Sequence, residues 1–289
     1  MTNAAVDNLT DKGYSEAIDF TVSRYENFPV ISFFLKARLR KHVAVVYQFA
    51  RQADDLADEG DIDPEERLEA LNRYEENFDR ALKGECADEF WRALNATIKE
   101  FNLSPRYFHD LLSAFKLDVT KRRYDTFAEI HDYCRLSANP VGRLILEFFD
   151  RRDEKYLKYS DSICTALQLT NFYQDVSIDI EKDRIYIPLD ELEYFNVELS
   201  QFHFRKNNSN FKKLLKHQVV RTGGLFNDGE KLIEYLPGEL KSQIRMTILG
   251  GRKILEKISR TDYDILENRP ELSRADYVKI FIKALIMKR

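Results

Sequence analysis

The stretch Gln168–Asp179, which reads QLTNFYQDVSID, constrains the fold of this chain more than any other. Four of its polar side chains fall within roughly 80° of one another on an α-helix, at about 100° per residue. They are Gln168, Asn171, Asp175 and Asp179. The positions between them include Leu169, Phe172, Tyr173, Val176 and Ile178. A helix that is apolar nearly all round is expected to be buried. A buried stripe of carboxylates and amides is costly without a partner, and Mg²⁺ favours oxygen ligands of this kind.

The low content of glycine and proline favours an all-α fold. The 289 residues include only ten glycines and seven prolines, and long stretches contain neither. A sheet with many turns needs more of both. The apolar fraction of 44% suits a globular protein with a sizeable core. We find no internal repeat, linker or low-complexity segment, so we expect a single domain over residues 1–289.

Charge, cysteine and histidine usage exclude several classes of function. The net charge is −4 and the basic residues are interleaved with acids, so no nucleic-acid partner is expected. Cys86, Cys134 and Cys164 lack metal-ligand spacing, which indicates reduced thiols in a cytoplasmic protein. The five histidines also lack such spacing and are expected at the surface or at helix caps. No signal peptide is present, and no apolar run reaches the ~18 residues that span a bilayer.

The C-terminal segment 277–289 is apolar with interspersed basic residues. This pattern is typical of an interfacial helix at the inner face of a membrane. It also fits a final helix docked on the core. Peripheral membrane contact therefore stays open at this level.

Caps and helix breakers predict the individual helices. Residues 1–13 are expected to be loosely ordered, and residues 180–188 to form a loop. The expected helices cover Tyr14–Asn27, about Arg38–Asp58, Glu65–Lys83, 87–101, Arg106–Asp118, a segment from Thr126 that Asn139-Pro140 interrupts, Val141–Phe149, and Asp161–Asp179. Later helices should break at Gly223-Gly224, Pro237-Gly238 and Pro270. The pairs Gly223-Gly224 and Gly250-Gly251 would permit close helix packing.

A second acidic face ends the helix expected near Arg38–Asp58. Asp54 and Asp58 are spaced i,i+4, and Arg51 lies on the same side, with Tyr47 one turn below it. An acidic cluster at a helix end is most often a solvated surface. Two such clusters on central, largely apolar helices suggest instead a Mg²⁺–diphosphate site at one mouth of a bundle. Arg51, Lys182 and Arg184 would supply positive charge.

These motifs resemble those of a known family. Asp54-x-x-x-Asp58 and Asn171-x-x-x-Asp175-x-x-x-Asp179 resemble the two aspartate-rich motifs of the squalene/phytoene synthase family. The segments 133–142 and 184–188 add to the resemblance, which extends from about Asn27 to Arg269. It implies the isoprenoid synthase fold, an all-α, single-domain helical bundle with a central apolar cavity.

Within the family, several segments resemble the bacterial hydroxysqualene synthases of hopanoid-type biosynthesis. They are 27–29, 39–43, 53–59, 134–143 and 249–257. Two departures from the wider family would alter the pocket: Asn139-Pro140 replaces Gly-x, and Gly251 replaces the tyrosine of a Tyr-Arg pair.

The resemblance implies conversion of presqualene diphosphate and water to hydroxysqualene and diphosphate. Head-to-head condensation of two farnesyl diphosphates, giving presqualene diphosphate, squalene or dehydrosqualene, is the alternative within the family. A helical scaffold without catalysis is a further alternative, which both intact acidic motifs disfavour.

The resemblance also implies roles for individual residues. Mg²⁺ would be bound by Asp54, Asp58, Asn171, Asp175 and Asp179. The diphosphate would be held by Arg51, Gln168 and Arg184. Tyr47, Tyr133 and Tyr186 would line the reacting centre, and Phe28 the prenyl pocket; Asn139 and Arg143 are candidates for positioning water. NADPH is not implied, and no dinucleotide fingerprint is present. A presqualene diphosphate synthase and an oxidoreductase are the implied functional partners.

Overall fold

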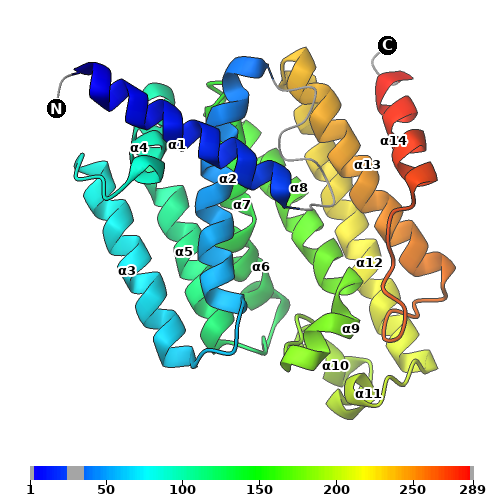
Figure 1. The fold of residues 1–289 in the computed structure, drawn as a ribbon. Helices are drawn as coiled ribbons and strands as arrows, with labels where there is room; N and C mark the ends of the chain where they lie inside the picture. The colour runs from blue at the N-terminus through cyan, green and yellow to red at the C-terminus, as the bar shows by residue number, and fades with distance from the viewer. Residues whose placement is uncertain (1–2, 25–35, 287–289) are drawn as a thin grey trace. The chain divides into compact units, whose positions relative to one another are not determined.

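The computed structural model describes residues 3–24 and 36–286, and within these ranges every regular element is a helix (Figure 1). This confirms the expected all-α fold. The chain groups into two compact units, one of residues 1–120 and 140–152 and the other of residues 121–139 and 153–289. The single domain and the central apolar cavity stay predictions, and each unit is described by itself.

Six helices are described in the first unit. They are α1 (Asn3–Ser23), α2 (Ala37–Asp58), α3 (Pro64–Leu82), α4 (Glu89–Phe101), α5 (Pro105–Thr120) and α7 (Asn139–Glu147). The expectation of loose order before residue 14 is wrong, because α1 begins at Asn3. A close approach explains this: a Cβ on Gly13 would collide with the Glu89 carbonyl of α4, and Lys12 binds the Glu89 carboxylate at 2.9 Å.

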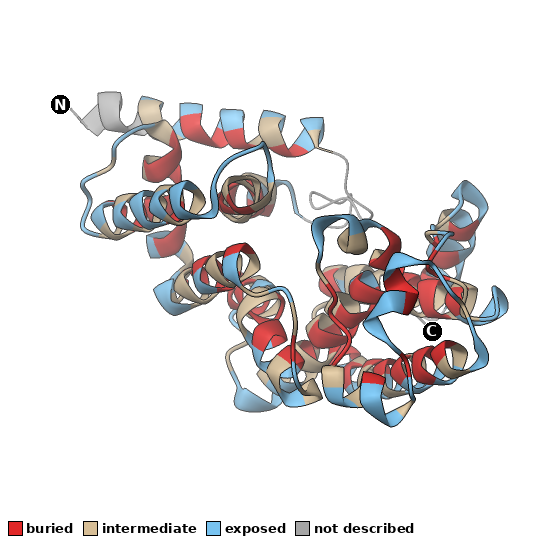
Figure 2. Ribbon diagram, turned by 90° about the horizontal axis from the view of Figure 1, so that it is seen from below, coloured by how far each residue is buried: buried red, intermediate tan, exposed pale blue. Residues whose placement is uncertain are grey.

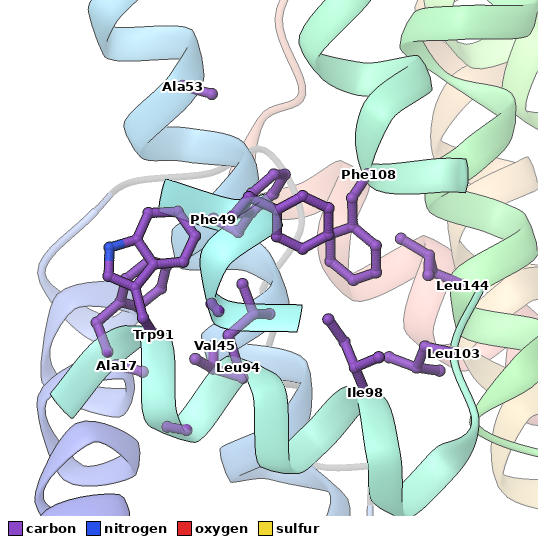
Figure 3. Packing of buried hydrophobic residues seen from close by; sticks show 14 of the residues in the cluster. Ala17, Val45, Phe49, Ala53, Trp91, Leu94, Ile98, Leu103, Phe108 and Leu144 are labelled. Carbon is purple, nitrogen blue, oxygen red and sulfur yellow. The ribbon is translucent and has the colours of Figure 1, made fainter. Parts of the chain in front are cut away.

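Helix α2 is central to the first unit, as its apolar turns predict. The Phe49 ring is fully buried, with its centroid 5.1 Å from those of both Phe78 and Phe108. Figure 3 shows Phe49 together with Trp91 and Phe108, which come from α4 and α5. Burying large aromatic side chains is the main stabilising contribution in a core of this kind. This core holds the end of α2 that carries Asp54 and Asp58.

The first unit also contains a buried histidine, although all five histidines were expected at the surface or at helix caps. His42 is only 2% exposed, so its placement at the surface or a cap is wrong. Its Nδ1 lies 2.9 Å from Thr97 Oγ1, which in turn lies 3.0 Å from the Tyr14 hydroxyl. Burial lowers the pKa of His42, against the opposite effect of Glu100. The imidazole is therefore held neutral where a free histidine begins to protonate.

This lowered pKa makes stability depend on pH. Between the folded pKa and about pH 6.5, the unfolded chain binds a proton at His42 that the folded protein does not bind. The contribution to stability is complete above about pH 6.5 and is lost as the pH falls through the folded pKa. Urea unfolding followed by circular dichroism, repeated at several pH values, should show that the free energy of unfolding decreases as the pH falls below about 6.5. In His42→Gln this decrease should be smaller. An equal decrease in His42→Gln and the wild type would contradict the effect assigned to His42.

In the part of the second unit that the structure describes, there are ten helices of different lengths. They are α6 (Phe127–Ser137), α8 (Glu154–Gln174), α9 (Val176–Asp179), η1 (Ile180–Lys182), α10 (Leu189–Tyr194), α11 (Leu199–His203), α12 (Ser209–Gly229), η2 (Glu230–Tyr235), α13 (Gly238–Arg260) and α14 (Arg274–Ile286). Helices α8, α12 and α13 lie side by side (Figure 1). Along the helices of each unit, buried residues follow one side and exposed residues the other (Figure 2).

Two expectations for this unit need correction. Helix α8 begins at Glu154 rather than Asp161, and α12 runs through Gly223-Gly224 without a break. A Cβ added at Gly223 or Gly224 would meet nothing within 4 Å, so this pair does not serve close packing. Gly251 does, because its Cβ would collide with the Phe226 ring. Tertiary contacts stabilise both helices beyond what local propensity predicts.

Gly229 is the glycine of α12 that permits a close helix contact. A Cβ there would lie 2.5 Å from Ile163 Cγ1 and 2.9 Å from both the Ile163 nitrogen and the Tyr159 carbonyl oxygen. Two of these three neighbours are backbone atoms of α8, which cannot turn away as a side chain can. Helix α8 is thus held against α12 at Gly229.

We expect Gly229→Ala to destabilise the protein by about 1–3 kcal/mol, because the methyl group must push α8 away. Gly224→Ala on the same helix is the matched control, and it should be neutral or stabilise by up to ~1 kcal/mol through helix propensity. Urea unfolding of the two variants measures the difference. Equal stability of both would show that the close contact is unimportant.

Candidate active site

Arg51 is engaged by acidic residues of its own helix end. Its Nη1 lies 3.0 Å from Asp54 Oδ2, its Nε 2.8 Å from Asp55 Oδ1, and its Nη2 3.1 Å from Glu59 Oε1. The one-turn spacing predicted for Arg51 and Asp54 is therefore confirmed. Asp54 keeps 41% of its side chain exposed, and Asp58 follows one turn later on the same face of α2. The pair presents carboxylates to solvent beside a guanidinium.

Asp55 and Arg24 belong to this cluster, although neither residue was predicted from the sequence to be part of a site. Arg24, just after α1, binds Asp55 Oδ2 at 3.0 Å and lies 3.7 Å from Glu59 Oε1. Burial raises the pKa of the Asp55 carboxyl, while Arg51 and Arg24 act in the opposite direction. Asp55 is thus the inward member of the Asp54-Asp55 pair, and it ties α1 to α2.

The other residues proposed as part of the site in the first unit have different outcomes. Tyr47 is half-buried on α2, one turn before Arg51, and its ring centroid lies 6.4 Å from that of Phe20. Phe28 lies outside the described residues. Arg143 has its guanidinium carbon 5.6 Å from the centroid of the Tyr107 ring, so it packs within the first unit.

The second acidic motif is not carried by one continuous helix. Helix α8 ends at Gln174, Asp175 has φ −101° and ψ 8°, and α9 begins at Val176. The one-turn spacing survives nevertheless. Asp175 N donates to the Asn171 carbonyl, and Asp179 N donates to the Asp175 carbonyl, each at 2.8 Å. Asn171, Asp175 and Asp179 therefore still follow one another at intervals of one turn.

The expectation of a buried stripe is wrong. Asn171 is exposed, and Gln168, Asp175 and Asp179 are only partly buried. Ile178, expected inside, is 43% exposed. The apolar side chains Leu169, Phe172, Tyr173 and Val176 are buried as predicted. The helix thus packs on its other sides and leaves its polar row accessible, so no buried partner is needed to compensate these groups.

Arg269 binds this motif through Asp175. Its Nε donates to Asp175 Oδ1 at 2.5 Å, and its Nη1 donates to Glu271 Oε1 at 2.8 Å. Arg269 lies between α13 and α14, far along the chain from Asp175. Arg269 is the last residue of the segment that resembles the family, and no role was predicted for it from the sequence.

The backbone beyond α9 holds Arg184 beside Asp179. Asp183 adopts φ 55°, Arg184 N donates to the Asp179 carbonyl at 2.8 Å, and Asp183 N donates to the Ile180 carbonyl at 3.0 Å. These two bonds form a Schellman motif, which terminates a helix with a left-handed residue. The segment expected to be a loop therefore begins with helix η1 and a defined cap.

Tyr133 and Tyr186 are brought together as the resemblance implies. The rings of Phe172 and Tyr186 are stacked, with centroids 3.9 Å apart and planes 3° apart. Tyr133 lies 5.8 Å from Tyr186 and 5.9 Å from Phe172. Tyr124, which was not selected, completes the group at 5.7 Å from Tyr186. This four-ring cluster joins α6 and α8 to the segment after η1.

Other polar contacts fix the position of α8. The Tyr173 hydroxyl donates to Gln218 Oε1 of α12 at 2.9 Å, and Gln218 Nε2 donates to Glu191 of α10 at 2.5 Å. Asn139 is buried, and its Oδ1 accepts a hydrogen bond from Thr165 at 3.0 Å. Asn139 thus supports α8 through Thr165. Its proposed role in positioning water stays a prediction.

The donor chemistry of both motifs fits Mg²⁺. The accessible groups are carboxylate and amide oxygens, the ligand type that this ion prefers. Within the described residues, no group of three or more His, Cys, Asp or Glu side chains forms a metal cage. Mg²⁺ is commonly bound by one or two carboxylates together with substrate phosphates, so a complete protein cage is not required.

Comparison with known protein families identifies the family of this chain. Residues 22–276 match the model of the squalene/phytoene synthase family. The chain belongs to this family. The match covers both acidic motifs, and the family resemblance read from the sequence is confirmed.

Individual relatives agree with this placement. The chain is 36% identical over 210 residues, 72% of this chain and 70% of the relative, to a hydroxysqualene synthase of Rhodopseudomonas palustris. It is 32% identical over 241 residues, 83% and 81% of the two chains, to a hydroxysqualene synthase of Sinorhizobium fredii. These relatives indicate an enzyme of the squalene/phytoene synthase kind.

A solved structure gives the same result for the fold. The squalene synthase HpnC from Alicyclobacillus acidocaldarius superimposes with a TM-score of 0.84 at 38% identity, covering 88% of this chain and 96% of that one. A dehydrosqualene synthase superimposes with a TM-score of 0.86 at 20% identity, covering 96% and 97% of the two chains. The second likeness concerns the fold alone.

The ring cluster yields a test that separates support from chemistry. Tyr186→Ala should destabilise the protein by about 3 kcal/mol or more, because it removes the ring stacked on Phe172. Tyr186→Phe keeps the stacked ring and should change stability by less than about 1 kcal/mol. Urea unfolding measures both. Only a loss of turnover by a stable Tyr186→Phe variant would assign a reaction role to the hydroxyl, and equal stability of the two variants would contradict the packing role.

Proposed function

We propose that this protein is a Mg²⁺-dependent hydroxysqualene synthase that converts presqualene diphosphate and water to hydroxysqualene and diphosphate. The single observation that carries the proposal is the level of identity to relatives that bear this name, 36% and 32% over most of the chain. The presence of both acidic motifs on accessible helix ends supports catalysis over a scaffold role.

In this proposal the metal would be held by the oxygen ligands of the two motifs, which are Asp54, Asp58, Asn171, Asp175 and Asp179. Bound Mg²⁺ would supply positive charge that stabilises the departing diphosphate. Arg51, Gln168 and Arg184 would bind the diphosphate oxygens directly. Guanidinium groups suit this role because they form paired, charge-assisted hydrogen bonds to phosphate. Arg51 would then exchange its contacts to Asp54 and Asp55 for contacts to the substrate.

The ring cluster supports the second part of the proposed reaction. Breaking the C–O bond of the cyclopropylcarbinyl diphosphate leaves a carbocation, which rearranges before water adds and a proton is lost. Aromatic faces stabilise a cation and exclude solvent from it. Tyr133 and Tyr186 present such faces on a rigid support, with Tyr47 and Phe28 proposed to extend the pocket. No redox step is involved, so NADPH is not proposed as a cofactor.

The second candidate is head-to-head condensation of two farnesyl diphosphates. The observation that favours it is the likeness, at 38% identity, to a structure described as a squalene synthase. The first proposal requires an enzyme that supplies presqualene diphosphate, and it leaves an alcohol for an oxidoreductase to act on. The second starts from farnesyl diphosphate alone if the product is presqualene diphosphate or dehydrosqualene, and it needs a hydride donor as well if the product is squalene.

Incubation of the purified protein with Mg²⁺ and one substrate at a time separates the candidates. We expect presqualene diphosphate to give hydroxysqualene and free diphosphate, detected by mass spectrometry. Farnesyl diphosphate alone should give no product. Turnover of farnesyl diphosphate to a condensed product would replace the first proposal with the second.

Substitution of the acidic motifs tests the site assignment. Asp54→Ala and Asp175→Ala should each lower turnover on the order of 100-fold or more, because charge stabilisation of the leaving group is lost. Asp61→Asn and Asp190→Asn change exposed acids of the two units outside the motifs, and they should retain activity. Unchanged turnover in Asp54→Ala and Asp175→Ala would refute the site.

A further inference from the structure

Among the described residues, helix α14 packs on the second unit through one side. Asp276, Ile280 and Ala284 are buried, and the helix packs against α13. The Asp276 carboxylate binds Lys257 of α13 at 2.7 Å and accepts a hydrogen bond from Ser273 N at 2.8 Å. The docked final helix that the sequence allowed is therefore present, and its single acidic residue is used in the attachment.

The opposite side of α14 is apolar and exposed. We call it the outer face. Its members are Val278, Phe281, Ile282, Leu285 and Ile286, which are 58%, 46%, 50%, 39% and 69% exposed. At about 100° per residue they cover an arc of roughly 140°. They make up five of the thirteen large apolar side chains that are exposed in the described residues. Single exposed apolar residues are ordinary, whereas a contiguous group marks an interaction surface.

Basic residues border the outer face. Arg274, Lys279 and Lys283 are exposed on α14. Lys279 and Lys283 also line a groove of about 250 Å³ between α13 and α14, together with Lys253 and Arg252. The acids of the groove have partners, since Glu256 binds Lys253 at 3.0 Å and Asp276 binds Lys257. In the described part of the chain, no carboxylate lies within 4 Å of Lys279 or Lys283.

We propose that the outer face of α14 docks on an anionic lipid bilayer. The apolar arc would enter the boundary between headgroups and acyl chains, with the helix axis in the plane of the surface. Lys279 and Lys283 would extend beside it and meet lipid phosphates at the groove. No described helix is long and apolar enough to cross a membrane.

Charge complementarity selects the bilayer over a second copy of the chain. The exposed charges of α14 are all positive, because Asp276 is buried against Lys257. A two-fold contact through the outer face would bring two such helices together, with no exposed acid on either to offset them. An anionic surface attracts the same three residues. Only α13 and α14 form this surface, and its docking does not depend on the proposed reaction.

Vesicle flotation tests the proposal without any substrate. The full chain is mixed with vesicles of phosphatidylcholine alone, or of equal parts phosphatidylcholine and phosphatidylglycerol. We expect the protein to float with the mixed vesicles, to bind phosphatidylcholine much more weakly, and to be released by salt. Failure of the wild-type protein to float with the mixed vesicles would overturn the proposal.

Two double variants and two matched controls locate the surface. Ile282→Ser with Leu285→Ser should abolish flotation, whereas Val220→Ser with Leu199→Ser, exposed apolar residues of α12 and α11, should not. Lys279→Gln with Lys283→Gln should weaken binding to mixed vesicles about fivefold for each charge. Lys213→Gln with Lys216→Gln, exposed on α12, should have little effect. Circular dichroism checks that each variant folds.

Two results would overturn the assignment of the surface. One is wild-type flotation by the Ile282/Leu285 variant. The other is a wild-type dimer in analytical ultracentrifugation that this variant dissociates, with no binding of vesicles by either protein. That result would assign the outer face to a second copy of the chain. Loss of flotation with unchanged turnover of detergent-dispersed substrate supports the proposal, and failure of the proposed reaction leaves the flotation result independent.

Discussion

Carboxylates at the C-terminal ends of helices are the physical constraint on which this structure depends. Asp58 is the last residue of α2 and Asp179 the last of α9, with Asp54 and Asp175 one turn before them. The helix dipole places partial negative charge at such ends, so acids there are unfavourable. An arginine offsets the charge in each unit, Arg51 on α2 and Arg269 near α9. Further stabilisation is available from any bound cation, which is why rows of acids at these positions suit a metal and a phosphate ligand.

The two units hold these helix ends in different ways. In the first, α2 passes through the centre of the core, and the Phe49 ring packs against Phe78 and Phe108. In the second, α8 is held by the close contact at Gly229, and the segment after α9 by a Schellman motif and the ring stacked on Phe172. Functional groups on well-packed helices keep their positions more closely than groups on loops. The acids are accessible, while the apolar residues between them are the support.

Helix α14 differs from most helices of the second unit in the side chains that it exposes. A typical surface helix buries an apolar face and exposes a polar one, as most helices here do. In α14 both sides are apolar, and the only acid faces α13. The sequence alone allowed a docked helix or an interfacial one. In the structure, one side of α14 is docked on α13. The interfacial role is a separate proposal, which concerns the exposed outer face of the same helix.

The sequence by itself determined the features that depend on local geometry. Helix periodicity and scarce glycine predicted the all-α fold, and the one-turn spacings of Asp54/Asp58 and of Asn171/Asp175/Asp179 follow from backbone hydrogen bonding, which acts over four residues. The resemblance in residues 133–142 and 184–188 associated Tyr133 with Tyr186, and the two ring centroids lie 5.8 Å apart.

Only the tertiary structure decided which groups compensate the acids and which faces are covered. Arg24 and Arg269 are distant in sequence from Asp55 and Asp175, so no local pattern could pair them. The exposure of Asn171 and Ile178, the burial of His42, and the uninterrupted course of α12 through Gly223-Gly224 depend on which neighbours pack where. Helix propensity is weak beside such packing, which explains why these expectations were wrong and the spacings were right.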